Sequence, residues 1–185
     1  MKPGVRVTGG AFRGRSLAVP PGARPTEGRV REALFSIWSE RLEGARVLDL
    51  FAGSGVVGLE AAGRGALCVL AVEEGLHAVK TLQANAVRLG EALLEVRRLA
   101  LPMGLGRLAA EGAGPFDLVY ADPPYNFSIY EDLLAGIGPL LATDGELVVE
   151  HSSRRALPLE TGGLVRVDTR RYGESALSFF RHRPD

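Results

Sequence analysis

The sequence predicts an α/β fold built on a mainly parallel sheet, and three observations carry that prediction. Short apolar segments of strand length alternate along the chain with segments whose apolar residues recur at helical spacing. The connections between these segments are short and rich in glycine, proline and aspartate. Apolar residues make up 46% of the 185 residues, so the chain can bury a core of its own.

The N-terminal segment departs from this alternation. Val5–Thr8 and Ser16–Val19 flank several glycines, which predicts a small β-hairpin, and the prolines at 20, 21 and 25 then predict a stiff linker. Thr26 can cap the helix that follows, whose apolar face includes Trp38. We therefore expect two parts: a basic hairpin and linker over residues 1–25, and the α/β domain over residues 26–185.

The strands and helices of the α/β domain can be placed from apolar runs and their spacing. The two segments near the C-terminus flank Tyr172-Gly173 and are expected to form an antiparallel pair. The expected strands are Arg46–Phe51, Leu67–Val72, Leu93–Leu99, Phe116–Ala121, Glu146–Glu150, Leu164–Asp168 and Ala176–Arg181, with helices over residues 76–89 and 130–141.

Composition excludes several classes of protein. No apolar run approaches the length of about 18 residues that a membrane span needs, and the first residues lack the apolar stretch of a signal peptide. Cys68 is the single cysteine, so a disulfide framework is excluded and the reducing cytoplasm is the expected location. The three histidines lack metal-ligand spacing, so no metal site is expected.

The formal net charge of zero conceals a strong segregation of charge. Residues 1–31 hold seven basic residues and one acid, residues 32–153 hold eight basic and seventeen acidic residues, and residues 154–185 hold seven basic and four acidic residues. Basic segments of this kind can lie along a polyanion, and they can also be ordinary solvated surface.

A glycine-rich loop follows the first strand of the α/β domain. Gly53–Gly58 reads G-x-G-x-x-G, and Glu73 follows Gly53 by 20 residues. This pattern predicts a nucleotide-type cofactor, because glycines let the backbone approach the ligand and the acid can bind ribose hydroxyls. Asp49, inside the strand, favours S-adenosylmethionine over a nicotinamide dinucleotide, since the methionine moiety carries an ammonium group. The chain is also too short for the substrate domain of a dehydrogenase.

A second motif, Asp122–Tyr125, follows the expected fourth strand and reads DPPY. Two prolines fix the backbone and remove two N–H donors, so the turn presents a carboxylate and rigid carbonyl oxygens. Such acceptors suit an exocyclic NH₂ group, and a tyrosine ring gives a base a surface on which to stack. Hydrogen bonds accepted from a conjugated amine would favour a tetrahedral nitrogen as it is methylated.

Together these motifs resemble the class I adenosylmethionine-dependent amino-methyltransferases. Five blocks, RVTGGAFRGRSL, RPTEGRVREALFSIW, LDLFAGSGVVGLEAAGRGA, FDLVYADPPY and RRYGESALSFF, resemble one family within that class, the bacterial 16S ribosomal RNA guanine-N2 methyltransferases, or RsmD family. The resemblance covers nearly the whole chain. It implies a Rossmann-like seven-stranded, mostly parallel sheet with an antiparallel last strand, a small N-terminal hairpin extension, and methylation of a guanine N2 in small-subunit rRNA.

The resemblance also implies roles for individual residues. The glycine loop and nearby residues would bind S-adenosylmethionine, the Asp122–Tyr125 turn would act on the target amine, and the basic N-terminus would bind rRNA. The expected cofactor-binding residues are Asp49, Phe51, Ala52, Gly53, Ser54, Gly55, Glu73, Leu99, Ala100 and Asp122. The expected catalytic residues are Asp122, Pro123, Pro124 and Tyr125, and the expected RNA-binding residues are Arg6, Arg13, Arg15, Arg24, Arg29 and Arg31.

The sequence departs from the family at two positions. Gly28 stands where the family usually has an acid, and the segment Arg98–Leu101 lacks the acid that often meets the adenine amine, so backbone at Leu99 or Ala100 is expected to serve instead. Two other functions stay open: a DNA adenine or cytosine amino-methyltransferase, and a non-catalytic RNA-binding or assembly protein that keeps the fold. The protein is expected to be a monomer whose partner is 16S rRNA within a small-subunit particle. The sequence does not identify the target nucleotide, and it does not decide between naked rRNA and the particle as the substrate.

Overall fold

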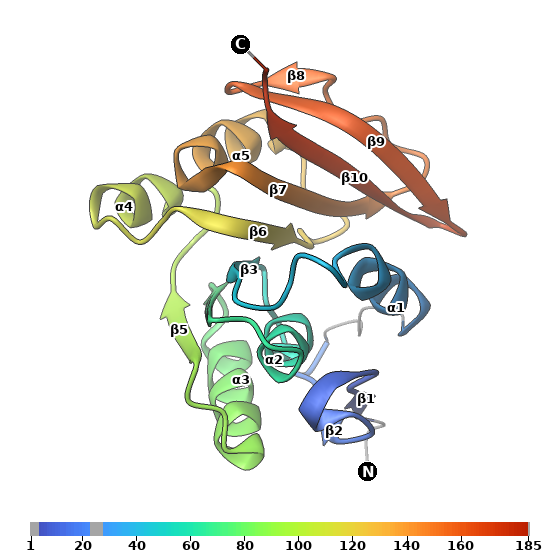
Figure 1. Cartoon of the computed structure of the whole chain (residues 1–185), viewed down its shortest axis with the longest axis vertical. Coiled ribbons are helices and arrows are strands. Elements are labelled where there is room, and N and C mark those ends of the chain that lie inside the picture. Colours follow the sequence, from blue (N-terminus) through green and yellow to red (C-terminus); the bar gives the residue numbers. More distant parts are fainter. Residues whose placement is uncertain (1–3, 23–27, 185) are drawn as a thin grey trace. The chain divides into compact units, whose positions relative to one another are not determined.

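A computed structural model of the chain describes residues 4–22 and 28–184 (Figure 1). The chain divides into two compact units, unit 1 over residues 1–99 and unit 2 over residues 100–185. This division falls in the middle of the expected α/β domain, and the N-terminal hairpin belongs to the same unit as the glycine loop. The predicted cap Thr26 and the predicted RNA contact Arg24 lie outside the described residues.

Unit 1 contains a parallel sheet of three strands in the order β5-β4-β3. The strands are β3 (Arg46–Leu50), β4 (Cys68–Glu73) and β5 (Leu94–Arg98), and the helices between them are α2 (Val56–Gly63) and α3 (Leu76–Leu89). Both helices pack against these strands. Strands covered by helices read as nearly continuous apolar runs, and β3 is buried at four of its five positions.

The N-terminal hairpin of unit 1 pairs β1 (Val5–Arg6) with β2 (Ser16–Leu17), with a 3₁₀ turn, η1 (Gly10–Phe12), between them. It packs against the end of α2, where a Cβ atom on Gly63 would lie 2.8 Å from the ring of Phe12. Helix α1 (Gly28–Ile37) follows. The predicted apolar face is buried at Val30 and Leu34 and partly buried at Ala33 and Ile37, and Trp38 is fully enclosed.

Unit 2 contains a mixed sheet in the order β6-β7-β10-β9-β8. Strands β6 (Phe116–Ala121) and β7 (Leu141–Ser152) are parallel, whereas β10 (Ser175–His182) runs antiparallel to both β7 and β9 (Leu164–Tyr172). The two-residue β8 (Glu160–Thr161) pairs with β9. Helices α4 (Leu105–Ala110) and α5 (Tyr130–Ile137) and the 3₁₀ turn η2 (Gly138–Leu140) complete the unit.

All seven strands expected in the α/β domain are present, as β3 to β7, β9 and β10, together with the N-terminal hairpin. The differences are local. Helix α4 and strand β8 are too short to give a periodic signal, and β7 begins at Leu141, five residues before the expected start at Glu146. Within the described residues, none of the helices is long and apolar enough to cross a membrane.

Candidate functional site

The glycine loop of unit 1 comprises residues 51–55, between β3 and α2. Phe51 has φ 58°, an uncommon conformation for a residue with a side chain, and strained backbone of this kind gathers at functional sites. Gly55 precedes the helix with φ 76°. A Cβ atom there would lie 2.6 Å from Leu82 Cγ, so this position accepts only glycine. The loop therefore leads directly into the N-terminus of α2, where main-chain N–H groups favour a negatively charged ligand group.

Asp49 lies beneath this loop, buried at 1% exposure. Its Oδ2 accepts a hydrogen bond of 3.0 Å from the backbone N–H of Gly58. Burial raises the pKa of Asp49 from 3.8 to about 7, a shift that the Gly58 hydrogen bond opposes and the nearby charge of Glu73 reinforces. A buried carboxylate with one backbone partner would be stabilised by a cation, so Asp49 is suited to an ammonium group.

Glu73, at the end of β4, organises the backbone on both sides of itself. Its Oε2 accepts a hydrogen bond of 2.9 Å from Gly53 N–H, and its Oε1 accepts two, also of 2.9 Å, from Glu74 N–H and Gly75 N–H. A carboxylate has about four acceptor sites, so Glu73 retains capacity for a ligand hydroxyl. The backbone N–H of Leu99, another predicted cofactor residue, donates to Glu73 O at 3.1 Å.

Asn85 on α3 is a residue of this region that the sequence analysis missed. Its side-chain amide is buried and donates to Ser54 O in the glycine loop at 2.9 Å. The same amide group exchanges two hydrogen bonds with the backbone of Ala18, just after the N-terminal hairpin. Asn85 therefore joins the hairpin segment to the glycine loop. The available signal was a polar residue on the apolar face of α3, three positions after Leu82.

In unit 2, the Asp122–Tyr125 turn follows the buried strand β6. The backbone N–H of Phe127 donates to Pro124 O at 2.8 Å and closes the turn. Asp122 is half-buried and Pro123 is buried, whereas the Tyr125 side chain is 83% exposed. A large aromatic ring this exposed at a rigid strand end contributes little to the core and is free to stack on a ligand.

The residues after this turn are held by aromatic contacts. The rings of Phe127 and Tyr130 meet edge to face, with centroids 5.0 Å apart. Burial raises the pKa of the Tyr130 hydroxyl, while Arg155 opposes and Asp122 adds to the shift. Below the turn, the hydroxyl of Tyr120 donates to the buried carboxylate of Glu150. The turn thus stands on a fixed base, and its carboxylate lies near enough to Tyr130 to influence its ionisation.

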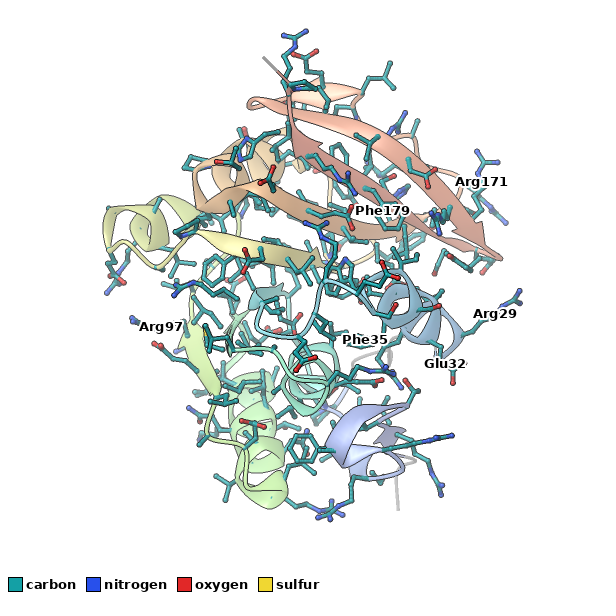
Figure 2. All side chains as sticks on the ribbon, in the orientation of Figure 1. Arg29, Glu32, Phe35, Arg97, Arg171 and Phe179 are labelled. Atoms are coloured by element: carbon teal, nitrogen blue, oxygen red, sulfur yellow. The ribbon has the colours of Figure 1, made fainter. Side chains whose placement is uncertain are left out.

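The predicted RNA-binding arginines separate into two groups. Arg6, Arg13, Arg15 and Arg29 are exposed, and Figure 2 shows Arg29 reaching away from α1 into solvent. Arg31 is different, because it is 2% exposed and its Nε donates to Glu60 Oε2 at 3.2 Å. A guanidinium enclosed in this way cannot reach a phosphate, so the RNA-binding role predicted for Arg31 from the sequence is wrong.

Glu60 on α2 is the reason that Arg31 is buried. This carboxylate is fully buried and accepts hydrogen bonds from Arg31, from Arg64 at 2.7 Å, and from the backbone N–H and hydroxyl of Thr8. Arg31 also donates to Arg6 O, so both charges help to hold the hairpin. An acid inside the apolar helix VVGLEAAG was a signal of a buried ion pair that the sequence analysis did not use.

Three comparisons with known proteins show what this chain is similar to. The profile of a family described as "Conserved hypothetical protein 95" matches residues 5–181. The small-subunit ribosomal RNA methyltransferase D of Escherichia coli is 37% identical over 83% of this chain and 78% of its own. A Bacillus subtilis protein named as a candidate rRNA methyltransferase is 33% identical over 97% of this chain and 100% of its own. A solved Escherichia coli structure, described as a candidate methyltransferase, is 28% identical with a TM-score of 0.80 over 98% of this chain and 99% of its own.

The fold and its two motifs are those of a class I methyltransferase, with a Rossmann-like sheet. The chain belongs to the family that the matching profile defines and that includes the small-subunit ribosomal RNA methyltransferase D proteins, the RsmD family. The fold class and the family predicted from the sequence are both confirmed.

Among residues 4–22 and 28–184, no group of three or more histidine, cysteine, aspartate or glutamate side chains is arranged to hold a metal ion.

Proposed function

We propose that this protein transfers a methyl group from S-adenosylmethionine to the exocyclic N2 amine of a guanine in 16S rRNA. The observation that carries the proposal is the Asp122–Tyr125 turn, in which a rigid strand end offers a carboxylate beside a tyrosine ring that is 83% exposed. The names of the relatives, which include small-subunit rRNA methyltransferases, support the RNA as the substrate.

The residues of unit 1 fit the cofactor. Asp49 is a buried carboxylate whose pKa is raised to about 7. A bound ammonium group would lower this pKa again, because the opposite charge stabilises the ionised carboxylate. Glu73 has acceptor capacity left for ribose hydroxyls, and the glycine loop offers backbone to the methionine end. The remaining assigned residues are Phe51, Ala52, Ser54 and Leu99 in unit 1, and Ala100 and Asp122 in unit 2. When bound, S-adenosylmethionine supplies an electrophilic methyl group on a sulfonium.

The residues of unit 2 prepare the nucleophile. The N2 amine of guanine is a poor nucleophile, because its lone pair is delocalised into the ring. Asp122 and the carbonyl of Pro123 would accept hydrogen bonds from the two amine hydrogens and stabilise positive charge on the nitrogen as it is methylated. Pro123 and Pro124 hold these acceptors still, and Tyr125 stacks on the base. The amine proton then leaves to Asp122 or to water.

The exposed arginines of the N-terminal hairpin and α1 would contact RNA phosphates. These are Arg6, Arg13, Arg15 and Arg29. Arg24, predicted from the sequence and outside the described residues, stays in the proposed set. Since each phosphate contact releases counterions, RNA binding should weaken steeply with salt although the net charge of the chain is zero. We further propose that the protein is a cytoplasmic monomer that meets its rRNA within a small-subunit particle and needs no metal.

The proposal is tested by methyl transfer from labelled S-adenosylmethionine to three substrates, namely undermethylated 16S rRNA, small-subunit particles that contain it, and duplex DNA. We expect label in the particle, and N2-methylguanosine as the product nucleoside in mass spectrometry. Label in naked rRNA alone would mean that the substrate is the free rRNA and not the small-subunit particle. Label in DNA, or a product methylated on adenine or cytosine, would contradict the proposal, and so would binding to RNA without transfer to any substrate.

A further inference from the structure

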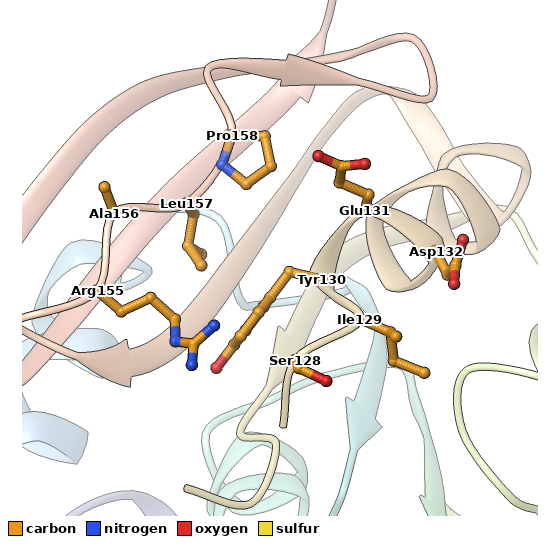
Figure 3. A pocket seen from close by; sticks show the side chains of 9 residues that line it. All are labelled: Ser128, Ile129, Tyr130, Glu131, Asp132, Arg155, Ala156, Leu157 and Pro158. Carbon is orange, nitrogen blue, oxygen red and sulfur yellow. The ribbon is translucent and has the colours of Figure 1, made fainter. Parts of the chain in front are cut away.

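Unit 2 contains a cavity that the proposed chemistry does not use. It has a volume of about 500 Å³ and two walls, residues 128–132 at the start of α5 and residues 155–158 after β7. Figure 3 shows the Tyr130 ring lying between these two segments, with its hydroxyl end directed toward the guanidinium of Arg155.

The cavity lies beside the Asp122–Tyr125 turn. Ser128, the first residue of its wall, follows Tyr125 by only three positions. Three residues of extended chain span at most about 10 Å, and the hydrogen bond from Phe127 N–H to Pro124 O folds this stretch more tightly. A polynucleotide whose target base stacks on Tyr125 would therefore bring its neighbouring nucleotide to the cavity.

Arg155 gives this cavity a surface on which a base can stack. Its guanidinium carbon lies 5.4 Å from the centroid of the Tyr130 ring, while the side chain is exposed. Because this side chain is exposed, its guanidinium plane is accessible to a ligand, and bases in RNA stack on such planes. The preceding Arg154 differs, because it points to Glu174 across an exposed ion pair of 3.4 Å.

The acidic residues of the cavity define the other part of the ligand. Glu131 and Asp132 line it together with Arg155, so a site for a bare phosphate is disfavoured by like-charge repulsion. A carboxylate instead accepts a hydrogen bond from a sugar hydroxyl. Figure 3 shows Glu131 reaching toward Pro158 on the opposite wall, where such a hydroxyl would meet it.

We propose that this cavity binds the nucleotide adjacent to the target guanine, with its base stacked on Arg155 and its ribose 2′-hydroxyl donating to Glu131. This inference rests on the proposed function, since it requires an RNA substrate. It adds a subsite that reads the flanking nucleotide and distinguishes RNA from DNA through the 2′-hydroxyl.

The test uses 16S rRNA, alone or in reconstituted small-subunit particles, and four variants. Arg155→Ala should raise the KM for rRNA about tenfold, a typical loss for one stacked base, with kcat and the KM for S-adenosylmethionine unchanged. Arg155→Lys should behave like Arg155→Ala, because lysine keeps the charge but lacks the plane. Arg154→Ala, the matched control, should stay within about twofold of the wild type.

A second arm tests the 2′-hydroxyl directly. The rRNA is ligated so that one neighbour of the methylated guanine, either 5′ or 3′, carries a deoxyribose. One of these two substrates should raise the wild-type KM about 10- to 100-fold, as expected for one hydrogen bond to a charged group. This difference should disappear in Glu131→Ala.

Several outcomes would overturn the subsite. They are equal effects of Arg154→Ala and Arg155→Ala, wild-type behaviour of Arg155→Lys, indifference to both deoxyribose substitutions, or a fall in kcat instead of a rise in KM, which would put the target base itself in the cavity. A wild-type protein that methylates no rRNA would overturn the proposed function, and the subsite with it.

Discussion

The glycine loop of unit 1 and the Asp122–Tyr125 turn of unit 2 both follow buried parallel strands, but they are held in opposite ways. The glycine loop has little rigidity of its own, and three side chains that come from elsewhere bond to its backbone or to the helix after it: Asp49, Glu73 and Asn85. The turn holds itself, because two prolines fix its backbone and Phe127 closes it.

This difference follows from what each segment presents. A loop that binds through its backbone must use glycine, and it then needs buried polar side chains to define its shape. A turn that binds through side chains can take its rigidity from proline and leave Asp122 and Tyr125 accessible. Substitutions near the glycine loop should therefore affect both stability and cofactor binding, whereas substitutions in the turn should affect turnover far more than either of these.

The largest effect is expected from Asp122→Ala. Removal of one preorganised group at a developing charge typically lowers kcat about 10²- to 10³-fold. Affinity for S-adenosylmethionine, measured by calorimetry, and the melting temperature should change little. Asp122→Asn, which keeps one acceptor oxygen, should recover part of the lost activity. Turnover of the alanine variant at the wild-type rate would remove the turn from the mechanism.

Asp49→Asn should weaken S-adenosylmethionine binding about 10- to 100-fold, which is the range for a hydrogen-bonded charge pair. The asparagine oxygen can still accept from Gly58 N–H, so the loop should keep its shape. Glu74→Gln is the matched control, because Glu74 is an exposed acid at the end of the neighbouring strand. Calorimetric affinities should show a loss confined to Asp49→Asn; equal affinities for all three proteins would contradict the assignment.

Asn85→Ala should lower the free energy of unfolding by about 2 kcal/mol, because it leaves buried backbone groups at the glycine loop without a partner. It should also weaken cofactor binding severalfold, since Ser54 loses its support. Gln83→Ala, an exposed position on the same helix, should change neither quantity measurably. Urea denaturation and calorimetry measure both. A destabilised variant with full cofactor affinity would show that Asn85 stabilises the fold without shaping the glycine loop for the cofactor.

The two units should also respond in opposite directions when the dependence of stability on pH is measured. Burial raises the pKa of Asp49 to about 7, so the folded state holds a proton that the unfolded state releases near pH 3.8. The contribution of Asp49 to the unfolding free energy therefore falls between about pH 4 and 7, with a slope no steeper than about 1.4 kcal/mol per pH unit.

His151 in unit 2 acts in the other direction. Burial lowers its pKa below 6.5, and its Nε2 lies 2.8 Å from the hydroxyl of buried Ser178. Below pH 6.5 the histidine of the unfolded state binds a proton that the buried His151 of the folded state does not, so stability is lost as the pH falls. Relative to the wild type, Asp49→Asn should gain stability as the pH rises to 7, and His151→Asn should gain as the pH falls below 6.5. Urea titrations at several pH values would reveal these opposite trends, and parallel curves would refute them.

The sequence was sufficient to predict those elements whose structure is determined by one local pattern. The seven long strands, the glycine loop and the proline-fixed turn could all be predicted, because each depends on residues that are adjacent in the chain. Helix α4 escaped prediction because six residues give too few turns for a periodic signal. Strand β7 was predicted too short because Asp144 and Gly145 usually indicate a turn, yet here they lie inside the strand.

Contacts between distant segments could not be predicted from local patterns. The sum of charge over residues 1–31 treated Arg31 like its exposed neighbours, although Glu60, its partner, lies 29 positions further along the chain. Asn85 and Ala18 are separated by 67 positions. Side chains that act across such separations require the fold before they can be recognised, and they include the residues that support the glycine loop.

The Glu60 cluster has a consequence for how this protein could be shortened or recombined. A truncation at residue 25 or 27 would remove Thr8 and Arg6 but keep Glu60 and Arg31. Buried Glu60 would lose both hydrogen bonds from Thr8, and Arg31 would lose its hydrogen bond to Arg6 O. Leaving a buried hydrogen-bonding group without its partner costs about 1–3 kcal/mol, and more for a charged group, which is a large part of the stability of a typical domain. The hairpin is therefore an integral piece of unit 1 and not an exchangeable module, and a chimera that grafts another N-terminus onto this chain must supply a replacement for Thr8.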